Sequence, residues 1–372
     1  MKIVIKHEDL QKALNVVAGV VPSKTAMPIL TCILMETGDD GLRLSATDLD
    51  VSVSTLAPNA SVKRKGRVAV PAAKFIAFVR SLTGGEVSIE EKSGKIAVVA
   101  GKAGLEEPGM NADEFPALPA LEQSKGIEAP AATVCGMVRS TAYAVSRDET
   151  RPPLMGILWE IRPEALRLVA TDAHRLARVE SHLKLGVREQ RSLIADTKGL
   201  QQLVRLAEEV ETLTIHLGSN QLSFGIGDTL LHIRLLEGPF PDYEAVIPRS
   251  NNKTIIADRE TLVQAVRRVA ITADRITSQI RLGVESGRME LTGAGSDGSR
   301  ADDEIPVSYE GDALEIGFNY NYLLDILRNI QADAVQVAVK DAQSAALITP
   351  SGEERGDQDL LCLLMPLRLS AD

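Results

Sequence analysis

A carboxylate and an imidazole stand two positions apart in the segment LRLVATDAHRLARVE, which spans residues 166–180. Asp172 and His174 have side chains that general acid–base catalysis uses, and Arg175 follows directly. A hydrolase or nuclease that uses this pair is therefore one hypothesis for the function. The competing hypothesis gives the segment a structural or partner-binding role, and the rest of the chain discriminates between the two.

The frame that contains Asp172 is repeated along the chain. LRLSATDLD at residues 42–50 aligns with LRLVATDAH at residues 166–174, and a weaker copy, MELTGAGSD, lies at residues 289–297. Self-similarity at one fixed period indicates tandem structural units. The shared L-R-L-x-A-T-D frame is therefore expected to be structural.

The histidine does not belong to the repeated frame. Asp48 occupies the position of Asp172 in the first copy, but Asp50 stands where the second copy has His174, and the third copy has Asp297 there. A scaffold tolerates such changes, whereas an enzyme needs only one intact copy. The comparison favours a scaffold and leaves the hydrolase hypothesis open.

Two further landmarks recur at nearly the same interval. A basic residue within a helical pattern appears three times, and an apolar residue followed by proline closes each copy. These landmarks are Arg80, Arg205 and Arg328, and Phe115-Pro116, Phe240-Pro241 and Met365-Pro366. Three landmarks at one period predict three similar domains, at residues 1–122, 126–248 and 249–372.

Each copy has the same order of helix and strand patterns. Apolar residues recur at spacings of three and four in two segments of each copy, which predicts amphipathic helices. Short apolar or alternating runs such as EVSIEE and TLTIHL predict strands. The predicted class is α+β, with two helices on one face of antiparallel sheets in each domain. The expected helical segments are 8–24, 72–82, 131–147, 198–207, 259–275 and 320–330.

Charge is distributed unevenly between these elements. The six helical segments hold thirteen basic and five acidic residues, a net charge of +8, whereas the whole chain has a net charge of −10. The other segments therefore sum to −18. A basic helical layer backed by acidic strands and loops suits a protein whose helices face phosphates while the remainder repels nucleic acid. The alternative, solvated helix faces without a partner, is weaker for six helices than for one.

The composition indicates a globular chain of several domains without a cofactor. Its 372 residues exceed the roughly 100–200 of one domain, and the start MKIVIKHEDL lacks the apolar run of a signal peptide, so we expect a cytoplasmic protein. Cys32, Cys135 and Cys362 are expected to be buried thiols, and no HExxH or HxxxH pattern predicts a metal site. GAGSDG at residues 293–298 precedes strand-like residues and is expected to be a turn.

Several motifs together resemble one known family. The repeated ATD frame, TDAHRLA, GPFPDYEAVIP and the terminal MPLRL are similar, in this order and over essentially the whole chain, to the bacterial DNA polymerase III beta subunit, the sliding clamp. The resemblance implies a non-enzymatic processivity factor that slides on double-stranded DNA without sequence specificity. It also implies a homodimer, in which two subunits of three α+β domains close head to tail into a ring with helices lining the hole.

The resemblance implies a docking pocket for short hydrophobic peptides between the second and third domains. Its partners would be the DNA polymerase III alpha subunit, the clamp loader, and other replication and repair proteins. An apolar cleft with a few polar groups suits such peptides. The residues carried over by resemblance are Leu154, Thr171, His174, Arg175, Leu176, Pro241, Val246, Asn319, Tyr322, Leu363, Met365, Pro366, Leu367 and Arg368.

Two further sets of residues follow from the same resemblance. The first set is basic and is expected to face DNA: Lys24, Lys74, Arg80, Arg147, Arg151, Lys198, Arg205 and Arg275. The second set is expected at the subunit interface: Leu105, Ile271 and Thr272. No catalytic residue, metal ligand or cofactor is expected.

Three features depart from the family pattern. Pro152-Pro153 stands where some relatives have paired tyrosines near DNA. AGLEEPGMN, at residues 103–111, is acidic and carries Pro108 where a pairing edge strand is expected, so the interface edge would be shorter or shifted. Ser370-Ala371-Asp372 extends past the usual end. A monomeric adaptor that uses the pocket without encircling DNA is a third hypothesis for the function.

Overall fold

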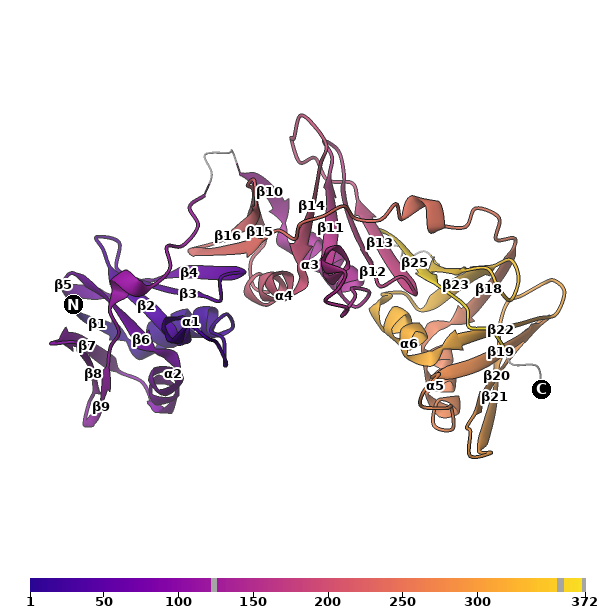
Figure 1. Ribbon diagram of the computed structural model, residues 1–372, viewed down its shortest axis with the longest axis horizontal. Helices are drawn as coiled ribbons and strands as arrows, with labels where there is room; N and C mark the ends of the chain where they lie inside the picture. Colours follow the sequence, from indigo (N-terminus) through magenta and orange to yellow (C-terminus); the bar gives the residue numbers. More distant parts are fainter. Residues whose placement is uncertain (122–125, 353–357, 370–372) are drawn as a thin grey trace. The chain divides into compact units, whose positions relative to one another are not determined.

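Edge strands of neighbouring sequence repeats pair with each other, so the repeats share their β-sheets (Figure 1). The fold consequently divides into two units rather than along the repeats. Unit 1 consists of residues 1–135 and 198–235. Unit 2 consists of residues 136–197 and 236–372. This computed structural model describes residues 1–121, 126–352 and 358–369, and the terminal Ser370-Ala371-Asp372 lies outside the described residues.

Unit 1 holds a five-stranded antiparallel sheet, ordered β5-β1-β7-β8-β9, and an eight-stranded one, ordered β10-β15-β16-β17-β4-β3-β2-β6. Their strands are β1 (Lys2–Lys6), β2 (Cys32–Thr37), β3 (Leu42–Thr47), β4 (Val51–Ala57), β5 (Ser61–Arg64), β6 (Gly66–Pro71), β7 (Glu86–Lys92), β8 (Lys95–Ala100), β9 (Ala103–Pro108), β10 (Ile127–Pro130), β15 (Thr212–Leu217), β16 (Gln221–Ile226) and β17 (Thr229–Arg234). The helices are α1 (His7–Ala18), α2 (Ala72–Ser81) and α4 (Thr197–Leu206), with 3₁₀ turns η1 (Pro28–Thr31) and η2 (Ala112–Glu114).

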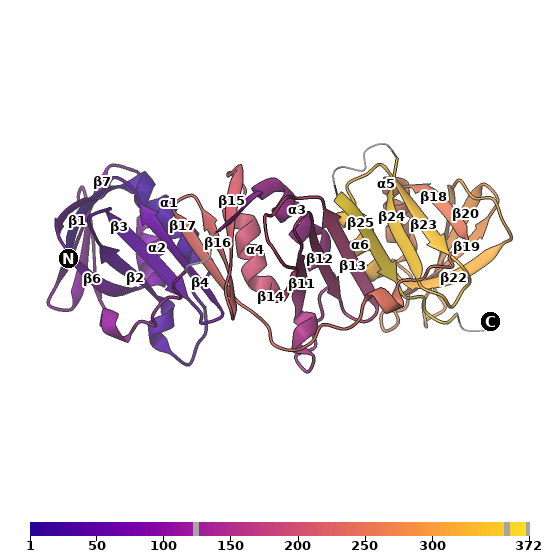
Figure 2. The same cartoon turned by 90° about the horizontal axis from the view of Figure 1, so that it is seen from above.

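Unit 2 holds an eight-stranded antiparallel sheet, ordered β14-β11-β12-β13-β25-β24-β23-β18, and a four-stranded one, ordered β21-β20-β19-β22 (Figure 2). Their strands are β11 (Gly156–Ile161), β12 (Leu166–Thr171), β13 (Arg175–Ser181), β14 (Arg191–Asp196), β18 (Lys253–Asp258), β19 (Gln279–Glu285), β20 (Arg288–Ala294), β21 (Arg300–Pro306), β22 (Leu314–Asn319), β23 (Ala334–Val339), β24 (Ala346–Ser351) and β25 (Gln358–Leu364). The helices are α3 (Ala131–Ala142), which begins in unit 1, α5 (Arg259–Val269) and α6 (Tyr320–Asn329), with 3₁₀ turns η3 (Pro152–Met155) and η4 (Glu244–Val246).

The helices form where the apolar spacing predicts them. In α1 the buried Leu10, Leu14 and Val17 recur at spacings of four and three, so they share one face that packs onto the sheet. Burying each such side chain stabilises the fold by about 1.5–3 kcal/mol. All six predicted helices exist, and the α+β class is confirmed. The helices α1, α3 and α5 end at Ala18, Ala142 and Val269, which is five or six residues before the predicted ends.

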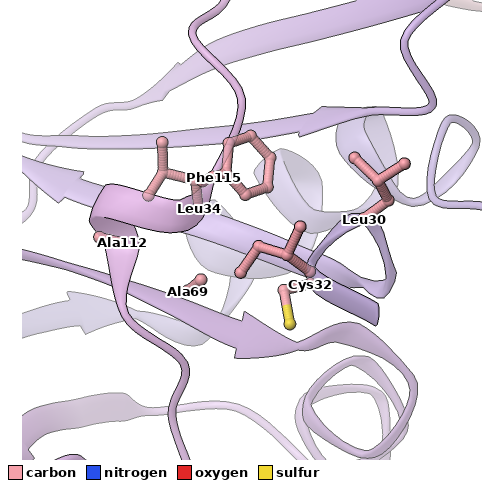
Figure 3. Close-up of a cluster of buried hydrophobic side chains, with 7 residues drawn as sticks. Leu30, Cys32, Leu34, Ala69, Ala112 and Phe115 are labelled. Atoms are coloured by element: carbon pink, nitrogen blue, oxygen red, sulfur yellow. The ribbon is translucent and has the colours of Figure 1, made fainter. Parts of the chain in front are cut away.

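The Phe-Pro landmark attaches each connecting segment to a sheet. Phe115 belongs to a buried cluster with Leu34 of β2 and Ala69 of β6, and the close-up shows its ring beside these strands (Figure 3). Phe240 packs in the same way against a cluster in unit 2 that contains Leu158 and Ile194. The landmark is therefore a packing anchor for the chain that leaves each repeat.

Two smaller expectations are confirmed. The GAGSDG segment is a turn between β20 and β21, in which the Gly295 N–H donates to the Ser299 carbonyl at 2.8 Å. Cys32, Cys135 and Cys362 are buried free thiols. Pro108 is the last residue of β9 and pairs opposite Lys95 within the ladder, so its effect on an interface edge stays a prediction.

Candidate partner-docking site

The segment that opened the sequence analysis forms β12, a tight turn and β13. Oδ1 of Asp172 accepts hydrogen bonds from the backbone N–H groups of His174 and Arg175, both at 2.9 Å. Ala173 adopts the left-handed backbone conformation, with φ of 75°, that this turn requires. Asp172 is therefore the residue that shapes the turn.

The first repeat builds the same turn. Oδ1 of Asp48 accepts from the backbone N–H groups of Asp50 at 3.1 Å and of Val51 at 2.7 Å. Leu49 has a φ of 82°, which matches Ala173. The structural reading of the repeated aspartate is confirmed.

The Asp172 and His174 side chains do not form an acid–base pair. Oδ2 of Asp172 accepts from Nε of Arg175 at 3.1 Å, whereas the His174 ring stacks on Tyr322 with centroids 6.1 Å apart. In the described structure no hydrogen bond joins the carboxylate to the imidazole. A general base needs such an orienting partner, so the geometry removes the main support for the hydrolase hypothesis.

Arg175 is enclosed by protein groups on all sides. Besides Asp172, its guanidinium donates to the Asp325 carboxylate and to the Tyr143 carbonyl, both at 2.7 Å, and lies 4.4 Å from the centre of the Tyr322 ring. The residue is 8% exposed. Arg175 therefore positions Tyr322, and through it His174, and offers a partner little surface of its own.

The predicted pocket residues combine a buried apolar base with exposed apolar groups. Leu154, Leu176 and Leu363 are 6%, 1% and 3% exposed, whereas Val246 and Met365 are 57% and 43% exposed. Val246 and Met365 therefore offer apolar side chains that a partner could contact. We call the fourteen predicted residues, all of which lie in unit 2, the docking surface.

Backbone hydrogen bonds bring the carboxyl-terminal segment to this surface. The N–H of Met365 donates to the His174 carbonyl at 2.9 Å, and that of Leu367 to the Gly317 carbonyl at 2.8 Å. Gln279 donates to the Arg368 carbonyl at 3.1 Å, so Met365-Pro366-Leu367-Arg368 runs past β13 and β22. The two sequence motifs AHRL and MPLR are thus adjacent, as the docking hypothesis requires.

Two further polar side chains complete the surface. Asn319 caps α6 by accepting from the backbone N–H groups of Asn321 at 2.9 Å and Tyr322 at 3.4 Å, which fixes the start of the helix that carries Tyr322. Thr171 donates to the Arg175 carbonyl at 2.7 Å across the turn. Pro241 lies exposed on the connecting segment before η4.

Sequence reasoning missed the residues that hold that connecting segment. The Tyr243 hydroxyl donates to Glu160 at 2.9 Å and accepts from Arg167, also at 2.9 Å, while Arg167 donates to Glu244 at 2.7 Å. Tyr243 is 6% exposed and packs in the cluster with Leu363. The tyrosine of the FPDY motif was the one hint in the sequence, since a tyrosine that becomes buried needs a hydrogen-bond partner.

The residues expected to face DNA are exposed, but most have partners within the protein. Lys74 lies 3.6 Å from Glu107, Arg151 lies 2.8 Å from Asp148, and Lys198 pairs with Asp48. Lys24, Arg147 and Arg275 are exposed and make no hydrogen bond or ion pair with residues in the described part of the chain. These last three are the most available to phosphates.

Arg205 connects two helices of unit 1. Its guanidinium donates to the carbonyls of Asn15 and Val16 in the last turn of α1, both at 2.9 Å. Gly19 permits this approach, since an added Cβ would lie 2.5 Å from the guanidinium. Arg80 donates to the Asn15 side chain at 3.0 Å, and Arg80 and Arg205 line one cavity of about 780 Å³ between α1, α2 and α4. The Arg205 guanidinium, which was expected to face DNA, is therefore used to stabilise the end of α1.

The residues expected at a subunit interface lie at sheet and helix edges. Ile271, just after α5, is 83% exposed. Thr272 is partly buried, and its hydroxyl donates to the Gly293 carbonyl at 2.9 Å. Leu105 is partly buried on β9, the edge of the five-stranded sheet. In unit 2, β21 is an edge of the four-stranded sheet.

The described residues carry little that could perform catalysis. No group of three or more His, Cys, Asp or Glu among them could hold a metal ion. Burial raises the pKa of the Cys362 thiol to about 12, which keeps it unreactive. None of the helices in this part of the chain has the length and apolarity to cross a membrane.

Comparison with known proteins assigns the class. Over its whole length the chain resembles solved sliding clamps: that of Bacillus subtilis, with 27% identity, complete coverage of both chains and a TM-score of 0.94, and that of C. crescentus, with 31% identity, 99% coverage of both and a TM-score of 0.93. A curated beta sliding clamp from Chlamydia muridarum is 30% identical over the full length of both proteins.

Family models identify all three domains in tandem. The N-terminal, central and C-terminal domains of the DNA polymerase III beta subunit match residues 1–119, 128–242 and 244–368. The chain belongs to the DNA polymerase III beta subunit family, the bacterial beta sliding clamps. It is therefore a non-catalytic DNA polymerase processivity clamp built from three α+β domains.

Proposed function

We propose that two copies of this chain close head to tail into a ring around duplex DNA and slide along it without reading its sequence. The observation that carries the proposal is the presence of all three family domains in tandem on one chain. The ring holds DNA by topology, so its contacts with phosphates need only be weak and independent of sequence. We propose with it three domains, at residues 1–122, 126–248 and 249–372.

The charge distribution supports sliding contact through the helices. The expected helical segments carry +8 within a chain of −10, and Lys24, Arg147 and Arg275 are free of intramolecular partners among the described residues. Exposed flexible cations of this kind attract phosphates while making no fixed register with bases. The acidic remainder disfavours binding of DNA to the outside.

Ring closure is supported by two open sheet edges and one exposed apolar residue. β9 and β21 are edge strands, and unpaired edges are templates for pairing with another chain. Ile271 is 83% exposed, so its apolar side chain is available to a partner surface. A head-to-tail contact between unlike surfaces produces a closed ring when its rotation closes.

Partner proteins dock short hydrophobic peptides on the docking surface of unit 2. Leu176 and Leu363 form its apolar base, and Met365, whose flexible side chain can adopt several shapes, suits a surface that serves several partners. The polymerase III alpha subunit and the clamp loader are the first partners proposed. Arg175 and Tyr322 keep the His174 side chain in place for them.

Processive synthesis tests the proposed function directly. The chain, with the polymerase III core and clamp loader, is added to a primed circular single-stranded template, and product lengths per binding event are measured under a challenge with excess template. Long products that depend on both the loader and this chain are expected. Products of unchanged length with and without the chain would contradict the proposal.

A peptide-binding assay tests the docking surface separately. His174→Ala should abolish binding of a polymerase tail peptide in fluorescence anisotropy while sizing chromatography still shows a dimer. Arg147→Ala is a matched control, because Arg147 is exposed in unit 2 but lies outside the docking surface. Unchanged peptide affinity in the His174 variant would exclude this surface as the site.

A further inference from the structure

The large sheet of unit 1 carries a row of polar residues across five neighbouring strands. Directly opposed residues from β15, β16, β17, β4 and β3 form this polar row: His216, Ser223, His232, Ser52 and Thr47. Residues opposed across strands share one face of a sheet. Ser223 and His232 are hydrogen-bonded through Oγ and Nδ1 at 2.8 Å, and Thr47 and Ser52 through their hydroxyls at 2.7 Å.

The corresponding row in unit 2 is apolar apart from Thr171 and contains the base of the docking surface. Its directly opposed residues, from β12, β13, β25, β24 and β23, are Thr171, Leu176, Leu363, Leu347 and Ala338. Each row runs across the pairing of two sequence repeats. Ser52 and His232 therefore stand where the docking surface has Leu176 and Leu363.

The backbone around the two rows is also equivalent. The N–H of Arg234 donates to the Asp50 carbonyl at 2.8 Å, just as the N–H of Met365 donates to the His174 carbonyl at 2.9 Å. Both contacts follow the same aspartate-shaped turn. Arg234 and Asp50 thus take the places of Met365 and His174. The backbone arrangement is the same at both junctions, whereas the side chains on it differ.

A cavity lies on the polar row, and one ring nitrogen of His232 is available to a ligand there. The junction cavity, of about 110 Å³, is lined by Leu49, Asp50, Ser52, Pro119, Asn220, Gln221, His232 and Arg234. His232 is 4% exposed, and its Nε2 has no hydrogen-bond partner among residues 1–121, 126–352 and 358–369. A ligand that enters the cavity would replace water as the hydrogen-bond partner of this nitrogen.

The lining of the junction cavity selects for a neutral ligand with both donors and acceptors. Arg234 and Asp50 carry opposite charges at 3.7 Å, and their side chains are 63% and 66% exposed at its mouth. A carboxylate would be attracted by Arg234 but repelled by Asp50, and an ammonium would be attracted by Asp50 but repelled by Arg234, so neither charge gains on balance. A primary amide can accept from the guanidinium and donate to the carboxylate, and the volume suits one side chain.

We propose that the junction cavity of unit 1 is a second docking position, which takes a glutamine or asparagine side chain of a partner segment. Leu49, which is 50% exposed, and Pro119 provide apolar contacts for the backbone of that segment. The position lies outside the docking surface, and its existence does not depend on hydrophobic peptides binding there.

Four capped amino acids test this proposal on the full-length chain labelled with ¹⁵N-histidine. The probes are the N-acetyl methylamides of glutamine, glutamate, lysine and norleucine, and the imidazole ¹⁵N signals of His232 are followed by NMR. The glutamine probe should shift these signals saturably, with an affinity about fivefold or more above that of each other probe. The His174 signals serve as the internal control for binding at the docking surface.

A double variant with both charged side chains neutralised provides the second measurement. Asp50→Asn with Arg234→Gln alters only exposed side chains, so the fold is retained, and it should lower the affinity of the glutamine probe about fivefold or more. Equal effects of all four probes, no saturable shift of His232, or full affinity in the double variant would each overturn the proposal. Failure of the docking surface would instead appear in the His174 signals with a hydrophobic peptide.

Discussion

At the scale of single residues, neighbouring Arg175 and His174 have separable roles. The Arg175 guanidinium bonds Asp172, Asp325 and the Tyr143 carbonyl and is 8% exposed, whereas the His174 side chain is exposed. Arg175→Ala would leave two carboxylates without their buried partner, at a cost of about 2–4 kcal/mol in unfolding free energy. His174→Ala should change that free energy by less than about 0.5 kcal/mol.

Urea unfolding of both variants, beside peptide anisotropy, measures this difference. Peptide binding should be lost in both, but only Arg175→Ala should shift the unfolding midpoint. Equal stability of the two variants would show that the contacts around Arg175 contribute nothing to the fold.

His232 gives the protein a pH-dependent stability. Burial, together with the nearby His216, lowers the pKa of its imidazole from 6.5 to about 4. Between these values the unfolded chain binds the proton and the folded chain does not, so stability rises with pH through this window and is lost as pH falls. The shift corresponds to at most about 3 kcal/mol.

An NMR titration of the His232 imidazole and thermal unfolding between pH 4 and 7 check this prediction. His232→Leu, which copies Leu363 of the equivalent row, should flatten the pH dependence of the unfolding midpoint. A titration midpoint near 6.5 would contradict the burial argument.

At the scale of elements, Arg205 is expected to fasten α4 to α1. It satisfies two carbonyls at the end of α1, which otherwise have no intrahelical partner. Arg205→Ala should therefore destabilise unit 1 by about 1–2 kcal/mol, whereas Arg147→Ala should leave stability unchanged and weaken DNA binding at low salt. Hydrogen exchange of α1 amides and DNA binding at two salt concentrations separate the two effects.

The exposed Ile271 is expected to hold two copies together. Ile271→Asp should convert the dimer to monomers in sedimentation velocity, because a charge would be buried against an apolar partner surface. Ile276, which is 94% exposed in the following loop, offers a matched control, and Ile276→Asp should leave the dimer intact. A dimer that survives Ile271→Asp would place the interface elsewhere.

The elements and the repeated turn were predictable from the sequence, because each depends on local spacing. Apolar residues at spacings of three and four defined the helices, and the aspartate of the ATD frame caps a turn within three residues of itself. The surroundings of Arg175 were not predictable, since Tyr143 and Asp325 lie 32 and 150 positions away. Periodicity also divided the chain into three, whereas strand pairing between repeats divides the fold into two units.

At the scale of the whole molecule, the two eight-stranded sheets share one backbone arrangement but carry different side chains. The same strand order and aspartate turn occur where the first and second repeats pair and where the second and third repeats pair. One sheet carries an apolar row beneath the docking surface, and the other carries a polar row beneath the junction cavity. The two repeat junctions thus present different surfaces on one scaffold, for which we propose the task of enclosing DNA.

Topological linkage to DNA is the central claim, and one measurement tests it most directly. The chain is loaded by the clamp loader and ATP onto a nicked circular plasmid, isolated by gel filtration, and the plasmid is then cut once by a restriction enzyme. A ring should stay on the circle and slide off the ends of the linear DNA within the time of the assay. Retention on linear DNA equal to that on the circle would contradict the ring.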